Sequence, residues 1–365
     1  MSTACIGRSK WDLDTPALLL DLERLECNIA RIAERCRSCS VDWRPHTKGN
    51  KTPAIAHKML DAGAVGITCA KLGEAEVMAA AGIRDILVAN QVVGEQKLAR
   101  LVSLRRHADV MVAIDDAFHV DSLSAAAVAA GVEVRVLVEI EVGMLRCGVA
   151  PGEHVLELAK RAAAAPGVIF AGVMGYEGHA MMMPDDEKRA ACEKAARTLK
   201  ESRELIEQAG LPVDIVSTGG TGTLAFTPSQ AGISEIQAGG GVLLDSFYPT
   251  GMNVKGLENA LTILTTVVSR PEPERAYVDC GKKTTNGEYQ LPTVLDREGV
   301  RLHTMSAETG YLELDGAGVP LKIGEKLELV SGYSDLTVCL HDVIYATRND
   351  GVEAVWDIQG RGKLQ

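Results

Sequence analysis

The stretch Val134-Arg135-Val136-Leu137-Val138-Glu139-Ile140 is an almost unbroken apolar run near the middle of the chain, rich in β-branched residues. Such a run is typical of a strand that is buried on both faces, as in a parallel sheet covered by helices. Comparable runs lie on both sides of it, separated by stretches rich in Ala, Glu and Leu. The predicted strands are residues 42–44, 64–69, 85–89, 110–114, 132–140, 168–175, 214–217 and 234–237.

The stretches between these runs have the apolar spacing of helices, and the alternation predicts the fold class. The predicted helices cover residues 54–60, 73–81, 95–106, 121–130, 153–164, 184–210 and 227–231. This strand–helix alternation, repeated over roughly 220 residues, indicates an α/β protein with a (β/α)8 TIM barrel. A doubly wound open sheet is the competing architecture. It requires a Gly-rich dinucleotide-binding turn after the first strand, and the sequence has none there.

After Tyr248 the pattern changes to short β-like runs separated by Gly, Asp, Pro and Asn turns, which predict a C-terminal antiparallel β domain. These runs are residues 260–269, 276–280, 300–304, 310–313, 326–330, 337–341 and 343–347. Near the N-terminus, Leu18-Leu19-Leu20 is a further predicted strand, and Asp21 is a predicted N-cap for a helix from Leu22 to Ala33. We therefore predict a barrel over residues 21–248 and a β-rich domain built from residues 1–20 and 249–365.

Composition and charge narrow the class of protein. The 365 residues carry a formal net charge of −11, which argues against nucleic acid or an anionic membrane as the partner. The sequence has no apolar run long enough for a membrane span, and its first residues lack the apolar core of a signal peptide. The nine cysteines are scattered, and Cys36 and Cys39 have no second pair with which to form a zinc site. We therefore expect a reduced cytoplasmic protein that acts on a small molecule.

A lysine follows the first predicted barrel strand, in Trp43-Arg44-Pro45-His46-Thr47-Lys48-Gly49-Asn50. Burial at the end of a strand favours the neutral amine of a lysine, and a neutral amine can form a Schiff base with an aldehyde cofactor. The alternative is an ordinary surface lysine after a strand. The other strand ends decide between the two readings, because active sites of such barrels lie where the strands end.

The fifth and sixth predicted strands deliver polar side chains at their ends. Arg146 follows a Gly-containing turn after the fifth strand, where it could pair with a ring oxygen, with a carboxylate, or simply with a neighbour in a rim salt bridge. Tyr176 and His179 follow the sixth strand in Tyr176-Glu177-Gly178-His179. A histidine and a tyrosine at one strand end suit proton transfer and ring contact, although a histidine that is only structural is the plainer alternative.

The seventh and eighth predicted strands end in glycine turns, Ser217-Thr218-Gly219-Gly220-Thr221-Gly222-Thr223 and Gln237-Ala238-Gly239-Gly240-Gly241. Glycines allow backbone N–H groups to converge on an anion, and these two strand ends are the usual phosphate site of the barrel. Neither turn is a Walker loop. Flexible glycine turns are the alternative. Two such turns together with Lys48 indicate a phosphorylated aldehyde, namely pyridoxal 5′-phosphate (PLP).

The order of these motifs resembles the D-threonine aldolase and D-serine dehydratase family, PLP enzymes of the alanine racemase fold type. The shared pattern is Pro-His-x-Lys, Gly-Met-x-Arg-x-Gly, Tyr-x-Gly-His, Gly-Gly-Thr-Gly-Thr and a glycine turn before Asp245. The resemblance covers essentially the whole chain, from Asp14 to Gly362. It implies a fold with a barrel and a β domain, a D-amino acid substrate and a homodimer.

The resemblance also implies roles for individual residues. Lys48 would carry PLP as a Schiff base, Arg146 would lie near the cofactor ring oxygen, and Tyr176 would contact the ring. His179 would be an acid or base on the substrate side. The implied phosphate-binding residues are Thr218, Gly219, Gly220, Thr221 and Gly240.

The sequence departs from the family pattern at several positions. Asn50 stands where family members have a second histidine after the lysine, and Gly241 stands where they have a tyrosine. At the family's C-terminal metal site Tyr333 replaces the histidine ligand, and Asp335 alone remains. Another family histidine is replaced by Thr309. A neutral phenol is a poor ligand for zinc or manganese, so the resemblance leaves a divalent metal open, with Asp335 as its one candidate ligand.

Four functional readings follow. The first is a lyase that cleaves D-β-hydroxy amino acids in a retro-aldol reaction to glycine and an aldehyde, with His179 as the base. The second is a dehydratase acting on D-serine or D-3-hydroxyaspartate, which is harder without a metal to assist the leaving hydroxide. The third is an amino-acid racemase with Lys48 and Tyr333 as its two bases. The fourth is a PLP-binding protein without turnover. The sequence favours the aldolase and leaves the β-substituent open.

Overall fold

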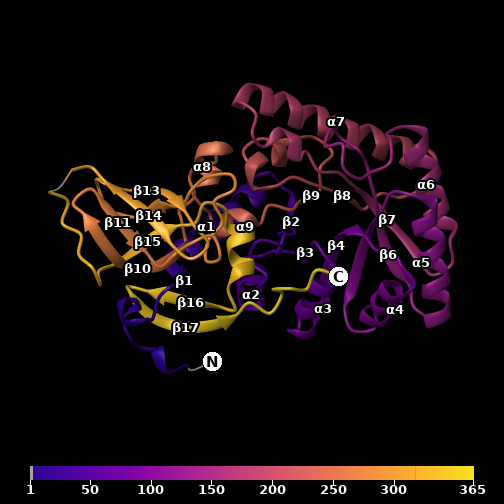
Figure 1. The fold of residues 1–365 in the computed structure, drawn as a ribbon. Helices are drawn as coiled ribbons and strands as arrows, with labels where there is room; N and C mark the ends of the chain where they lie inside the picture. The colour runs from indigo at the N-terminus through magenta and orange to yellow at the C-terminus, as the bar shows by residue number, and fades with distance from the viewer. Residues whose placement is uncertain (1–2, 317) are drawn as a thin grey trace. The chain divides into compact units, whose positions relative to one another are not determined.

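The computed structural model describes residues 3–316 and 318–365, and its chain divides into two compact units (Figure 1). The barrel unit comprises Ala30–Lys48, Ile55–Gly239 and Gly362–Gln365. The β unit comprises the chain up to Ile29, together with Gly49–Ala54 and Gly240–Arg361. The chain thus passes from one unit to the other directly after Lys48.

The barrel unit is built on eight parallel strands in the order β2-β9-β8-β7-β6-β5-β4-β3. The segment that follows β2 also bonds to β3, because the Thr47 N–H donates to the Thr68 carbonyl (2.7 Å) and the Thr68 N–H donates to the Pro45 carbonyl (2.9 Å). These bonds join the two edges of the sheet, so the predicted barrel is confirmed. The strands are β2 (Asp42–Trp43), β3 (Ile67–Cys69), β4 (Asp85–Gln91), β5 (Asp109–Ile114), β6 (Val134–Glu139), β7 (Val168–Met174), β8 (Ile215–Thr218) and β9 (Glu235–Ile236).

Helices alternate with these strands; the first two each begin in the β unit and end in the barrel unit, and the others cover the outside of the barrel (Figure 1). The helices are α1 (Leu22–Ser38), α2 (Pro53–Asp61), α3 (Leu72–Ala80), α4 (Glu95–Leu104), α5 (Ala117–Ala130), α6 (Glu153–Ala164) and α7 (Asp185–Gln208). The predicted N-cap is confirmed, because Asp21 Oδ1 accepts from the Arg24 N–H (3.0 Å). The predicted helix over 227–231 is wrong: only a 3-10 turn, Thr227–Ser229, forms there, and the chain between β8 and β9 is otherwise irregular.

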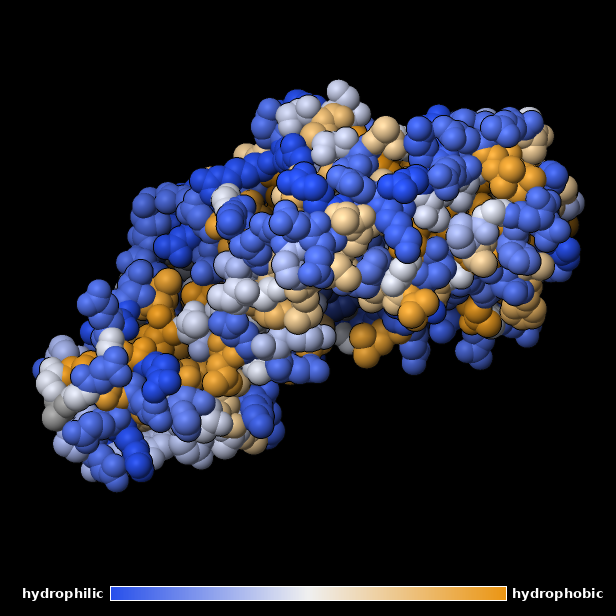
Figure 2. Space-filling model, turned by 90° about the horizontal axis from the view of Figure 1, so that it is seen from above, coloured by the Kyte–Doolittle hydropathy of each residue, from blue (hydrophilic) through white to orange (hydrophobic). Residues whose placement is uncertain are grey.

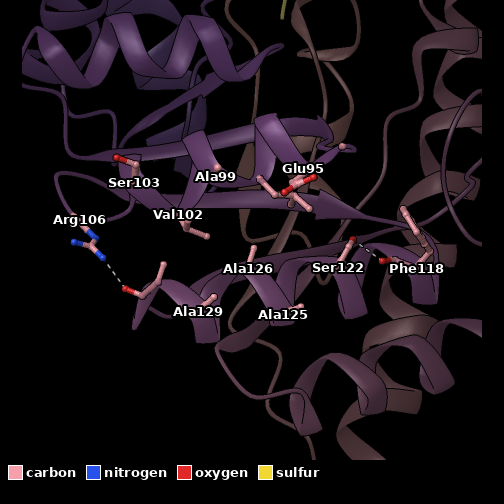
Figure 3. A pocket seen from close by; sticks show the side chains of 13 residues that line it. Glu95, Ala99, Val102, Ser103, Arg106, Phe118, Ser122, Ala125, Ala126 and Ala129 are labelled. Carbon is pink, nitrogen blue, oxygen red and sulfur yellow. Dashed lines mark hydrogen bonds between the residues drawn. The ribbon is translucent and has the colours of Figure 1, made fainter.

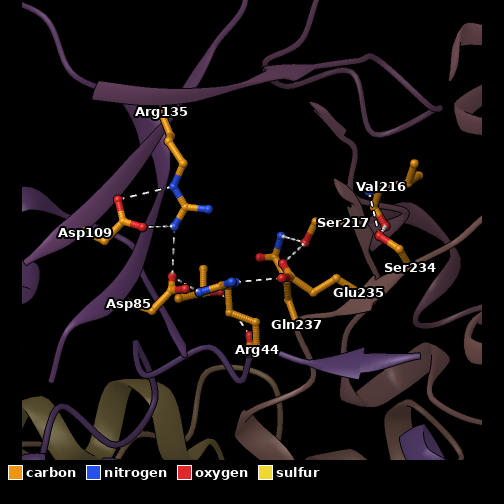
Figure 4. Close-up of polar contacts among 10 residues, drawn as sticks. Arg44, Asp85, Asp109, Arg135, Val216, Ser217, Ser234, Glu235 and Gln237 are labelled. Carbon is orange, nitrogen blue, oxygen red and sulfur yellow. Dashed lines mark hydrogen bonds and ion pairs between the residues drawn. The ribbon is translucent and has the colours of Figure 1, made fainter. Parts of the chain in front are cut away.

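The barrel interior is layered, because alternate residues of a strand share one face. At the amino ends of the strands, Arg44 pairs with Glu235 (2.7 Å) and with Asp85, while Arg135 pairs with Asp109 and Asp85 (Figure 4). An apolar layer follows two residues further along, formed by Leu87, Met111 and Leu137. Because the amino end is filled with paired charges and the middle with apolar side chains, polar residues that act on a ligand belong at the carboxyl ends.

The β unit contains a nine-stranded sheet with the path β13-β14-β11-β10-β1-β16-β17, and β15 pairs with β10 and β12. The N-terminal strand β1 lies between β10, to which it is antiparallel, and β16, to which it is parallel. The strands are β1 (Ala17–Asp21), β10 (Leu261–Glu272), β11 (Arg275–Val278), β12 (Thr293–Val294), β13 (Val300–Met305), β14 (Gly310–Leu314), β15 (Lys326–Val330), β16 (Val343–Arg348) and β17 (Gly351–Asp357).

One predicted strand of the β unit is wrong. Residues 337–340 lie in two helical turns, α9 (Ser334–Thr337) and the 3-10 turn Val338–Leu340, and His341 follows them in extended conformation. The Thr337 hydroxyl donates to the Tyr333 carbonyl (2.9 Å), and Asp245 accepts from both the N–H and the hydroxyl of Ser334. These bonds stabilise the first turn of α9. Its partner Asp245 is far away in the sequence, so the local alternation of apolar residues did not indicate this helix. The short helix α8 (Phe247–Gly251) follows Asp245.

On the face shown in Figure 2, hydrophilic residues cover most of the surface and apolar residues form small separate groups. Within residues 3–316 and 318–365, no helix has the length and apolar content that crossing a membrane requires.

Candidate active site at the carboxyl ends of the barrel strands

Lys48 is carried on backbone that belongs to the barrel. It follows β2 by five residues and is half-buried. Its own N–H donates to Nδ1 of His46 (3.3 Å), and the preceding Thr47 is held by β3 through both its N–H and its hydroxyl. Because β2 and β3 are neighbours in the closed barrel, Lys48 lies at the rim formed by the carboxyl ends of the strands.

Arg146 lies in the loop after β6, between an aromatic ring and a carboxylate. Its guanidinium carbon is 5.5 Å from the centre of the Tyr176 ring, and its Nη2 is 3.8 Å from Oε1 of Glu139. Burial raises the pKa of Glu139, although the hydrogen bond from Gln91 (2.6 Å) and the charge of Arg146 partly oppose this. Arg146 itself is about half exposed. It therefore has room to contact a ligand at this rim.

The Tyr176 ring is held between glycines of two different loops. A Cβ added at Gly178 would come within 2.5 Å of the ring, and one added at Gly220 within 3.2 Å. The Tyr176 hydroxyl contacts Sδ of Met181 (2.7 Å), and Met181 in turn packs on Gly222. The loops after β7 and β8 thus pack on each other through glycines, which explains why these positions have no side chain.

His179 lies in a 3-10 turn, Gly178–Ala180, and packs on Gly143 of the preceding loop. A Cβ at Gly143 would come within 2.6 Å of the imidazole, and Gly143 has a φ of +123°, so glycine is required there on both counts. Nδ1 of His179 is buried and has no hydrogen-bond partner among the residues that the structure describes. A buried ring nitrogen without a partner is suited to exchange a proton with a ligand.

The glycine turn after β8 is organised by Glu177, which is fully buried. Its Oε2 accepts from the Thr218 hydroxyl (2.9 Å) and the Gly219 N–H (3.2 Å). Its Oε1 accepts from the hydroxyls of Thr223 (2.7 Å) and Thr227 (2.6 Å). Two residues of the predicted phosphate set, Thr218 and Gly219, therefore direct these donors at a carboxylate of the protein.

Three predicted site residues, Gly240, Tyr333 and Asp335, lie in the β unit. The Tyr333 hydroxyl donates to Oδ2 of Asp335 (3.3 Å). Oδ1 of Asp335 packs on Gly49, where an added Cβ would collide with it. Gly240 has no room for a side chain, because the Tyr248 hydroxyl occupies that position. Gly49 also belongs to the β unit, so this contact lies within that unit.

These residues do not fit a divalent metal. Within residues 3–316 and 318–365, no three His, Cys, Asp or Glu side chains group closely enough to hold an ion. The Tyr333 phenol donates a hydrogen bond to Asp335, whereas a metal would require a lone pair from a deprotonated ligand. Nearby His341 is bonded through Nε2 to the Thr284 carbonyl (2.7 Å). The Tyr333–Asp335 pair therefore occupies the position of the metal site that the family resemblance implies.

Asp245 connects α8 with α9 and is fully buried. Oδ1 accepts from the N–H groups of Phe247 and Tyr248, and Oδ2 accepts from the N–H and hydroxyl of Ser334. Burial raises the pKa of Asp245 from 3.8 to about 6, the bonds from Ser334 and Tyr248 lower it, and the charge of Asp335 raises it. Burial thus raises the pKa of Asp245 by more than the hydrogen bonds to its carboxylate lower it.

This raised pKa predicts a pH-dependent stability. Between about pH 4 and 6 the folded protein binds a proton at Asp245 that the unfolded chain has released, so the free energy of unfolding should fall as pH rises through that range. A pKa raised from 3.8 to about 6 corresponds to roughly 3 kcal/mol. Urea unfolding between pH 4.5 and 7.5 should show this slope in the wild type and lose it in Asp245→Asn. An unchanged slope in the variant would show that other groups cause it.

A large apolar groove lies elsewhere in the barrel unit, on the outside between α4 and α5 (Figure 3). It has a volume of about 740 Å³, and its walls are mostly alanines together with Leu98, Val102 and Phe118. The polar groups at its rim are bonded locally: Arg106 donates to the Ala130 carbonyl and Ser122 to the Phe118 carbonyl. None of its lining residues belongs to the predicted site, so we assign it no catalytic part.

Sequence reasoning missed two carboxylates at this rim, Glu139 and Glu177. Both lie inside motifs that the sequence singles out, beside Arg146 and His179 respectively. The available signal was an acidic residue at the end of an apolar strand, as for Glu139, or three residues beyond one, as for Glu177, where a buried carboxylate needs donors. Which donors it finds depends on loops that are 40 to 50 residues away in the chain.

The donors gathered in the barrel unit fit an anionic aromatic aldehyde. Lys48 offers an amine, Tyr176 a ring face and Arg146 a cation, and the glycines of the loop after β8 leave room for the Tyr176 ring and Met181. His179 offers a buried ring nitrogen. This donor set is the one that the PLP prediction requires.

Comparison with known proteins gives a consistent result over the whole chain. Residues 20–246 match the family of the alanine racemase N-terminal domain, and residues 260–347 match a putative serine dehydratase domain. A D-threonine aldolase from Arthrobacter sp. is 38% identical over 96% of this chain and 93% of its own length. A 3-hydroxy-D-aspartate aldolase from Paracoccus denitrificans is 38% identical over 98% of this chain and 94% of its own length. The crystal structure of D-threonine aldolase from Filomicrobium marinum superposes with a TM-score of 0.96 at 36% identity, covering 99% of this chain and 98% of that one.

Proposed function

Because the chain belongs to the family of D-threonine aldolases and related D-serine dehydratases, which share the alanine racemase N-terminal domain, we propose that it cleaves D-β-hydroxy amino acids into glycine and an aldehyde. The observation that carries this proposal is the arrangement of Lys48, Tyr176 and His179 at the carboxyl ends of the barrel strands. Two relatives that match nearly the full chain are named aldolases, which favours this reaction over dehydration.

The family implies PLP, and the residues of the barrel rim suit it. Lys48 would hold it covalently, the 218–221 turn would hold its phosphate, and Arg146 and Tyr176 would contact its ring. The sequence predicts Gly240 as a further residue that binds the phosphate. When bound, PLP supplies an electron sink for the electron pair released at the substrate α-carbon.

His179 is the proposed base. Its Nδ1 is buried and has no partner within residues 3–316 and 318–365, so accepting the proton of the substrate β-hydroxyl would satisfy this nitrogen. Loss of that proton turns the β-carbon into a carbonyl as the Cα–Cβ bond breaks, which releases the aldehyde. Gly143 leaves the space that the His179 imidazole fills, and Gly178 leaves the space that the Tyr176 ring fills.

The product test separates the aldolase from its alternatives. With PLP and D-threonine or D-phenylserine, we expect glycine and the aldehyde in equal amounts, and with EDTA we expect the rate to stay within about twofold. The reason is that Tyr333 and Asp335 do not form a metal site. The measurement is glycine formation by chromatography, with D-serine and D-3-hydroxyaspartate as further substrates.

Other outcomes would replace the proposal. Ammonia and a 2-oxo acid from D-serine or D-3-hydroxyaspartate would show a dehydratase. Loss of optical activity without glycine or ammonia would show a racemase, for which Lys48 and Tyr333 are the candidate bases. Cofactor binding with no turnover of any substrate would show a PLP-binding protein. A rate that EDTA abolishes and manganese restores would show that a metal acts here despite Tyr333.

A further inference from the structure

Glu177 has an environment that a surface or core carboxylate rarely has. It is fully buried, and its four donors are the Gly219 N–H and the hydroxyls of Thr218, Thr223 and Thr227. A buried carboxylate is retained when its bonds fix a conformation that would otherwise be loose. Here the conformation is that of the glycine turn after β8, whose glycines would otherwise leave it flexible.

The bonds of Glu177 reach the whole turn. Gly219 has a φ of +83° and is held by its N–H. Thr223, at the other end of the turn, donates to Glu177, and its hydroxyl oxygen accepts from the Gly220 N–H (3.2 Å). The orientation that Glu177 imposes on Thr223 is thus passed on to Gly220. Thr227 holds the carboxylate from beyond the turn (2.6 Å).

We propose that Glu177 is the positioning residue for phosphate binding: it does not touch the phosphate, but it fixes the turn from Thr218 to Thr223 in the shape that receives it. This inference rests on the proposed PLP function. A preformed turn binds an anion more tightly because its ordering does not have to occur on binding. The negative charge of Glu177 is compatible with an anion nearby, because four donors are directed at its two oxygens.

The test compares two ligands that differ only in the phosphate. In Glu177→Gln one oxygen becomes an NH2 group, so whichever way the amide lies, two of the four donors lose their acceptor. We expect the dissociation constant of PLP to rise by about 10- to 100-fold and that of pyridoxal to stay within about twofold, because both attach to Lys48 but only PLP uses the turn. The measurement is absorbance titration of the cofactor with purified protein.

Two further variants keep the test decisive. Thr227→Val removes one donor outside the turn and should raise the dissociation constant of PLP by about threefold without changing that of pyridoxal. Glu235→Gln is the matched control, since Glu235 is a buried carboxylate at the amino end of β9, bonded to Ser217 and Arg44. It should affect both ligands equally.

The outcomes are distinguishable. If Glu177→Gln and Thr227→Val leave the PLP affinity unchanged, or weaken PLP and pyridoxal by the same factor, Glu177 is only structural and the inference fails. If the wild type itself binds no PLP, the proposed function fails instead. Inorganic phosphate provides a check on the wild type, because it should compete with PLP and not with pyridoxal.

Discussion

The Lys48→Ala variant is expected to lose covalent attachment of PLP and to lose activity by roughly 10⁴-fold or more. The reason is that an amine at this position is the one group that the proposed site offers for bonding an aldehyde, and alanine removes it without filling the space. After borohydride reduction and proteolysis, the wild type should carry the cofactor label on the peptide that contains residue 48. The variant should carry no label above background.

Lys71→Ala is the matched control for this experiment. Lys71 is an exposed lysine at the same rim of the barrel, two residues after β3, and it has no place in the proposed site. It should keep both the label and the activity. Persistence of the label in Lys48→Ala, or its appearance on another peptide in the wild type, would show that the anchor is assigned to the wrong residue and would remove the basis of the proposed function.

The His179→Ala variant should lower kcat by about 10²- to 10⁴-fold while PLP still attaches to Lys48. The expectation follows from the buried, unpartnered Nδ1 of this residue, which is the atom proposed to take the proton of the β-hydroxyl. The dissociation constant of PLP should remain within about twofold, because the imidazole packs on Gly143 and has no part in the phosphate turn. Steady-state kinetics and cofactor titration on the same preparation separate the two effects.

His154→Ala serves as the control, since His154 is exposed on α6 and should leave kcat unchanged. An unchanged kcat in His179→Ala would assign the base elsewhere. The next candidate would then be Tyr333, which the sequence already indicates as a base of the racemase alternative.

Much of the architecture follows from local patterns that act within a few residues. All eight barrel strands appear within three residues of their predicted bounds, because a strand covered on both faces has to be continuously apolar. The two incorrect elements, the helix over 227–231 and the strand over 337–341, lie where long-range hydrogen bonds override local propensity. Thr227 is bonded to Glu177, and Ser334, which begins the turns over 337–341, is bonded to Asp245. The domain boundary predicted at residue 248 stays a prediction.

The sequence by itself determined the barrel, the order of the site motifs around its rim and the candidate anchor Lys48, because strand ends of a parallel barrel converge whatever the loops do. Only the tertiary structure decided what the carboxylates do. It gave Glu177 its four donors, paired Tyr333 with Asp335, and placed β1 between β10 and β16. The physical reason is that a buried polar group needs hydrogen bonds. The sequence indicates which polar groups will be buried, whereas their partners come from distant segments that folding brings together.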